Sequence, residues 1–108
     1  QIKNLFVMIT EEIFSKALNS KYIIIEEHEL HTVLKDAEIL REENTYLSDH
    51  IRLLKYNDIL FIQEITFNKE VLLRKMDSMK DADSFIQERL DYYERKWDGC
   101  GCKIDYYE

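Results

Sequence analysis

Turn-forming residues are almost missing from this chain, and their scarcity restricts the folds open to it. The 108 residues contain no proline and only two glycines, Gly99 and Gly101. All-β folds usually show a turn signal at intervals of roughly ten residues, often built from glycine or proline. The lack of such signals over residues 1–98 therefore predicts helices joined by short turns of Asn, Asp and Ser.

The clearest helix signal lies in residues 68–99. Asn68 occupies an N-cap position, Glu70 falls in the first turn, where the helix dipole favours an acid, and Gly99 follows as a C′ residue. Between these ends, apolar residues alternate at spacings of four and three, as in a heptad seam. We predict a C-terminal helix over 69–98 with coiled-coil character, whose seam is an interface within the chain or between two copies. The predicted interface residues are Leu72, Met76, Met79, Ile86, Leu90, Tyr93 and Trp97.

Two further helices are predicted upstream, over residues 4–19 and 27–55, because apolar residues recur there at helical spacing. In the second segment, the regular spacing of apolar residues is interrupted at Asn44, which lies in a polar run. This helix is therefore either continuous or divided near that residue. For the first segment, an alternative places a strand at residues 5–9 and starts the helix after Thr10, which would act as its cap.

Two short runs have a more strand-like composition. Residues 22–25 and 59–67 are rich in β-branched and aromatic side chains, which pack well in strands. The overall prediction is a mainly α fold, a small helical bundle over 1–98 followed by a C-terminal tail over 99–108. A short strand or hairpin near 59–67 is the main alternative within it.

Charge and hydropathy restrict the classes of partner that this chain is expected to bind. The chain carries 22 acidic and 15 basic side chains, a net charge of −7. It has no Lys/Arg-rich block, and affinity for nucleic acid comes largely from cationic side chains that neutralise phosphates. Its longest apolar runs are far shorter than the roughly 20 residues that a membrane-spanning helix needs. Two cysteines fit an intracellular protein better than a disulfide scaffold. We expect a cytoplasmic protein with no membrane partner.

Enzyme chemistry has little support in the sequence. No glycine precedes Gly99, so a glycine-rich phosphate loop is excluded, and no serine lies in a recognisable catalytic context. We expect no enzyme activity and no cofactor. We assign no zinc site, because a Cys-x-Cys gap is narrower than that of common structural sites and the histidines are distant in sequence. Its candidate ligands would be Cys100, Cys102, His28 and His31.

The leading functional hypothesis is a non-enzymatic protein–protein interaction or regulatory module. It would act through an acidic helical surface and self-associate, as a homodimer, through its C-terminal helix. The alternative is a DNA-binding transcriptional regulator that resembles winged-helix proteins in outline. In that alternative, apolar residues over 37–54 follow helix-turn-helix spacing, and the run 59–67 begins a wing. The DNA-reading residues would be His50, Arg52 and Lys55.

Overall fold

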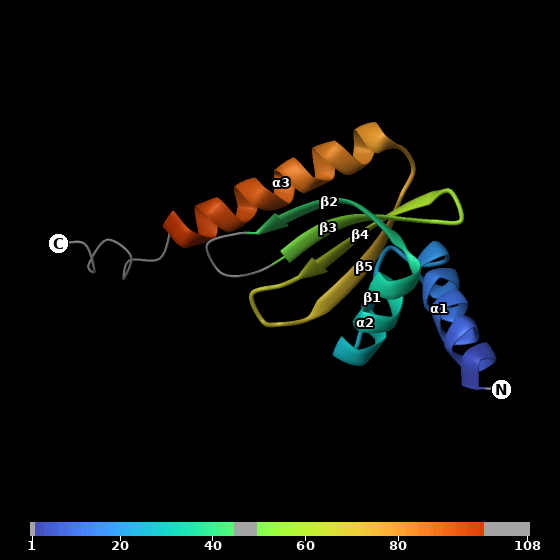
Figure 1. Cartoon of the computed structure of the whole chain (residues 1–108). Helices are drawn as coiled ribbons and strands as arrows, with labels where there is room; N and C mark the ends of the chain where they lie inside the picture. Colours follow the sequence, from blue (N-terminus) through green and yellow to red (C-terminus); the bar gives the residue numbers. More distant parts are fainter. Residues whose placement is uncertain (1, 45–49, 99–108) are drawn as a thin grey trace.

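The computed structural model describes residues 2–44 and 50–98, with side chains over 10–44 and 50–95. It contains three helices and one antiparallel sheet in these residues (Figure 1). The elements in chain order are α1 (Ile2–Leu18), β1 (Ile23–Ile25), α2 (Glu27–Asp36), β2 (Glu38–Asn44), β3 (His50–Tyr56), β4 (Ile59–Ile65), β5 (Val71–Met76) and α3 (Met79–Asp98).

The sheet has the strand order β1-β5-β4-β3-β2, and every neighbouring pair is antiparallel. Strands β2 to β5 form a meander of consecutive neighbours. Strand β1 instead joins the far edge, where Ile24 pairs with Leu72. The chain therefore carries α2 across one face of the sheet between its first and second strands.

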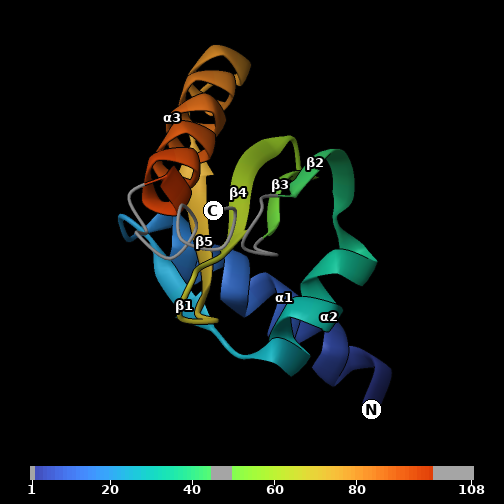
Figure 2. The same cartoon turned by 90° about the vertical axis from the view of Figure 1, so that its left-hand side faces the viewer.

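Helices cover both faces of the sheet, which gives the protein three layers (Figures 1 and 2). Helices α1 and α2 pack on one face around a core that includes Phe14, Val33 and Leu54. Helix α3 packs on the other face, where its Ile86 lies in a core with Ile62 of β4. Successive side chains of a strand point to opposite faces of the sheet. Because helices cover both faces, two neighbouring residues of one strand can both be buried.

Tight turns in this sheet are made without glycine. Strands β3 and β4 pair up to Tyr56 and Ile59, and the two residues between them, Asn57 and Asp58, have φ of 52° and 64°. Two successive residues at positive φ are typical of a type I′ hairpin turn. Between β4 and β5, Lys69 takes φ of 70°. Asn and Asp tolerate this left-handed region better than most residues, so a sheet was possible despite the missing glycines.

The predicted mainly α bundle is wrong. The prediction for residues 27–55 was helix throughout, either continuous or divided near Asn44. In the structure, only α2 at the start of this segment is helical, and the strands β2 and β3 follow it. Leu, Glu, Lys and Arg favour helices intrinsically, but the sheet pairing of this segment overrides that preference. A helix is present at α1 as predicted, and the run 59–67 contains the strand β4.

The predicted C-terminal coiled coil is also wrong. Helix α3 begins at Met79, and the residues before it form β5. Its start is capped by Ser78, whose Oγ accepts a hydrogen bond from the backbone N–H of Asp81 at 3.1 Å. Asn68, the predicted cap, lies instead in the connection between β4 and β5. The apolar residues of β5 and α3 had suitable spacing for one seam, but they belong to two elements.

Candidate functional site

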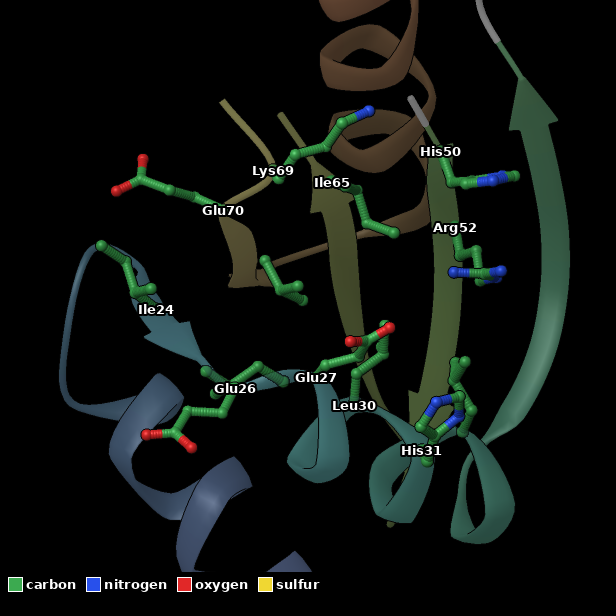
Figure 3. A pocket seen from close by; sticks show the side chains of 13 residues that line it. Ile24, Glu26, Glu27, Leu30, His31, His50, Arg52, Ile65, Lys69 and Glu70 are labelled. Carbon is green, nitrogen blue, oxygen red and sulfur yellow. The ribbon is translucent and has the colours of Figure 1, made fainter. Parts of the chain in front are cut away.

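A pocket of about 770 Å³ opens between α2 and the ends of β3, β4 and β5 (Figure 3). Its floor is apolar and comes from the sheet and from the inner side of α2. The apolar floor residues are Ile25, Leu30, Leu34, Ile65 and Val71. Leu30 and Leu34 reach it together because residues four apart share one side of a helix.

Helix α2 supplies one polar wall of the pocket. Glu27 and His31 line it, and they share a helix side for the same reason as the two leucines (Figure 3). The helix start is held by a capping box. The side chain of Glu26 accepts from the backbone at Glu29, and the Glu29 carboxylate accepts from the backbone N–H of Glu26 at 2.9 Å. This cap fixes where Glu27 enters the pocket rim.

Strand β3 supplies the opposite wall through His50 and Arg52. The Arg52 guanidinium is held in place from two sides. Its Nε donates to Glu42 Oε2 at 2.6 Å, and its Nη1 donates to Gln63 Oε1 at 2.7 Å. Arg52 and Gln63 are cross-strand partners, so they lie side by side on the same face of the sheet.

Two polar atoms at this wall lack partners among the residues that the structure describes. One is Nε2 of Gln63, whose side chain is fully buried, and the other is Nδ1 of His50. Buried polar atoms are nearly always paired, with protein, water or ligand. We define the recognition corner as His50, Arg52 and Gln63. Nε2 of Gln63 is a donor without an acceptor among the described residues, whereas Nδ1 of His50 can donate or accept according to the tautomer.

A second buried polar cluster lies on the other face of the sheet, beneath α3. Glu64 on β4 is fully buried, and Oε2 of its carboxylate accepts from Arg89 Nη2 at 2.8 Å and from the hydroxyl of Tyr93. Arg74 Nη2 lies 3.8 Å from the other carboxylate oxygen. Arg74 in turn stacks on Phe85, with the guanidinium 4.9 Å from the ring centroid.

This cluster changes the titration of Tyr93. Burial raises the pKa of the Tyr93 phenol far above its ordinary value of 10, and the hydrogen bond to the Glu64 carboxylate raises it further. The phenol is therefore neutral at physiological pH and keeps donating to Glu64. Since the cluster joins β4 to α3 through Glu64, Arg89 and Tyr93, we assign it to holding the helix in position.

The predicted interface residues of β5 and the start of α3 do not form a helical seam. Leu72 and Met76 lie on β5, where Leu72 is buried within the chain and Met76 packs half-buried against α3. Met79 begins α3 and is 46% exposed. These three side chains therefore do not share one continuous surface in the way that the heptad spacing predicted.

The later members of the predicted interface lie on α3. Ile86 and Tyr93 are buried against the sheet, and Leu90 packs half-buried beside them. Trp97 belongs to α3, but its side chain lies outside the described part. The buried residues serve the chain's own core. Contact of this set with a second protein remains a prediction.

The residues of the DNA-binding alternative lie on a strand. His50, Arg52 and Lys55 all belong to β3, so the recognition helix in which they were placed is absent from the described residues. Two of them nevertheless came together at the pocket. DNA binding remains a prediction, without the helix that was expected to carry it.

The candidate zinc ligands, for which no site was assigned, are only partly covered by the described residues. His31 lines the pocket, whereas Nδ1 of His28 lies 3.4 Å from Glu26 on the exposed side of α2. Cys100 and Cys102 lie outside the described residues. Within 2–44 and 50–98, no group of three or more His, Cys, Asp and Glu residues is placed to hold a metal ion.

Gln63 and Glu64 were missed in the sequence, although a signal was present. They are two adjacent polar residues inside the otherwise apolar stretch Ile59–Ile65. Burying a polar side chain is costly unless it is paired. In a strand, adjacent residues face opposite sides, so this pair indicates one buried polar site on each face of the sheet.

Within residues 2–44 and 50–98, none of the helices is both long enough and apolar enough to cross a membrane. A scan against protein-family models finds no match, and searches of curated proteins and of solved structures find none either. Evidence on function therefore comes from the pocket, with its apolar floor and its recognition corner.

Proposed function

We propose that this chain is a non-enzymatic protein–protein interaction module, which holds an apolar segment of its partner in the pocket between α2 and the sheet. The observation that carries the proposal is the open pocket of about 770 Å³ with an apolar floor and a charged rim. This arrangement matches the general anatomy of interfaces, in which an apolar centre is surrounded by polar residues.

The shape of the pocket favours a segment of another chain as occupant. The pocket is open to solvent along one side, so an extended segment can enter it without leaving the chain to which it belongs. Its volume lies within the range of roughly 300–1,000 Å³ that is typical of specific binding sites. Filling it would cover Leu34 and Ile65, which are only partly buried by the chain itself.

The charges on the rim favour one orientation of the bound segment. Glu27 lies on the α2 wall, whereas Arg52 lies on the β3 wall, and Lys69 stands above the floor on the connection between β4 and β5 (Figure 3). Charges of opposite sign on different walls favour one direction of a bound segment over the other.

The test is selection of binding peptides with a matched pair of variants. A displayed library of random heptapeptides is panned on the wild-type protein, and the enriched peptides are measured against Ile65→Arg and Ile59→Arg. Both isoleucines are half-buried ends of β4 on the same face of the sheet, but Ile59 lines a separate hollow near Phe14. Circular dichroism checks that both variants remain folded.

We expect enriched peptides to bind the wild type and Ile59→Arg alike and to lose binding to Ile65→Arg, because arginine would fill the apolar floor. If the peptides bind the wild type and both variants equally, they contact the protein outside the pocket, and the proposal is wrong. A library that yields no binding peptide would contradict the proposal.

A further inference from the structure

We infer, building on the proposed function, that the pocket recognises the C-terminal end of its partner: a free α-carboxylate at the recognition corner, with the last apolar side chain on the pocket floor. Gln63 is the fully buried member of the recognition corner. Its Oε1 is occupied by Arg52, and a guanidinium can only donate, so the orientation of the amide is determined and Nε2 is the free half. The free group is therefore a donor that needs an acceptor.

The other members of the recognition corner favour an acceptor with negative charge. Arg52 is cationic, and its Nε and Nη1 already have partners that hold the guanidinium plane in place. His50 has a buried Nδ1 without a partner in the described part of the chain, and the imidazole can donate there in one neutral tautomer or when protonated. A carboxylate accepts several hydrogen bonds at once, which matches this group of donors.

Charge near the recognition corner is almost balanced by the chain itself. Glu42 offsets the charge of Arg52, and Lys69 on the β4–β5 connection adds a cation at the pocket rim, where Glu70 follows it in the chain. Glu26, before the start of α2, adds a further carboxylate to the lining. Glu27 lies across the pocket on α2 (Figure 3). A bound carboxylate is therefore expected on the β3 side, away from Glu27.

The spacing between the recognition corner and the floor distinguishes a chain end from an acidic side chain. Gln63 and Ile65 lie on the same face of β4, two residues apart, which is about 7 Å along a strand. A terminal residue carries its α-carboxylate and its side chain on the same carbon, so both can reach these two places. An internal Asp or Glu carries its carboxylate on the side chain, so a different residue of the partner would have to fill the floor at Ile65.

The acceptor has to enter beside Arg52, because Gln63 lies just beneath the pocket lining and is fully buried. A buried water would satisfy the same donors without any partner. The two possibilities differ in one measurable respect: only a carboxylate ligand makes binding depend on the negative charge of the peptide end.

The experiment compares two heptapeptide libraries of the same random composition. One is displayed with a free C-terminus, and the other is fused through its C-terminus to the display protein. We expect Ile65-dependent binders only from the first library. If both libraries yield such binders, the proposed function as an interaction module stands, but the inference that the pocket recognises a chain end is overturned. Binders from neither would overturn the proposed function itself.

An enriched peptide is then measured as free acid and as amide, with hexanoate as a third probe. We expect the amide to bind about 10- to 100-fold more weakly than the acid, the range for loss of hydrogen bonds to a charged group. Hexanoate should bind much more weakly than the peptide. If hexanoate binds as tightly as the peptide, the pocket is a site for small carboxylates and the inference fails.

Gln63→Glu is the decisive variant. The new carboxylate still accepts from Arg52 Nη1, so the wall should stay folded, but it replaces the free donor with an acceptor. We expect affinity for the free acid to fall about 10- to 100-fold, while affinity for the amide changes little. Equal effects on acid and amide would show that a water, rather than the peptide end, pairs with Gln63. Lys55→Gln, also on β3 but outside the pocket, serves as the control.

Discussion

Among single residues, Tyr93 ties the titration of a side chain to the stability of the fold. Burial raises the pKa of its phenol, and the contact with Glu64 adds to this. In the unfolded chain the phenol releases its proton near pH 10, whereas the folded chain retains it to higher pH. The stabilisation by this group is therefore complete below pH 10 and decreases as the pH rises above 10 toward the folded pKa.

We expect Tyr93→Phe to remove this decrease in the free energy of unfolding above pH 10. In urea unfolding between pH 8 and pH 11, the stability difference between wild type and Tyr93→Phe should shrink above pH 10 by about 1.4 kcal/mol per pH unit. Tyr92→Phe retains Tyr93 and should keep the wild-type slope. A difference that is constant with pH would mean that Tyr93 titrates normally in the folded protein.

Among the elements, the β3–β4 hairpin has a turn whose second central residue, Asp58, is not the one preferred there. Asp58 adopts φ of 64°, which is unfavourable for a residue with a Cβ atom, and glycine is preferred at this position of a type I′ turn. We expect Asp58→Gly to stabilise the protein by about 0.5–1 kcal/mol in thermal or urea unfolding.

Asp58→Ala is the matched control for this turn. It removes the same carboxylate, which is almost fully exposed and lies 3.9 Å from Lys55, but it keeps a Cβ atom at positive φ. Alanine should therefore destabilise the hairpin. If glycine and alanine have the same effect, the charge rather than the backbone conformation controls this turn.

For the whole molecule, stability depends on two cores, one on each face of the sheet. Ile86 belongs to the core beneath α3 and is fully buried, whereas Met79 on the same helix is 46% exposed. We expect Ile86→Ala to lower the free energy of unfolding by about 2–5 kcal/mol. Met79→Ala should change it by less than about 0.5 kcal/mol. Equal effects of the two substitutions would mean that α3 does not pack on the sheet as described.

The local parts of this structure could be predicted from the sequence because their causes are local. The helical stripe of α1, the β-branched run of β4 and the turn at Asn57 and Asp58 depend on neighbouring residues only. The pocket's cationic wall was noticed in part, since His50 and Arg52 were named as binding residues, although for DNA and on a helix.

Tertiary structure decided the rest, because a strand is stabilised by partners that sequence spacing does not reveal. Leu53 and Leu54 are adjacent and both buried, which is compatible with a helical stripe, but in β3 they belong to different cores on opposite faces of the sheet. Leu72 became part of β5 through pairing with Glu64 in the preceding strand and with Ile24, which is distant in sequence. Pairing of β3 with β4 placed Gln63 beside Arg52. The recognition corner therefore exists only once the sheet has formed, since its residues meet across strands.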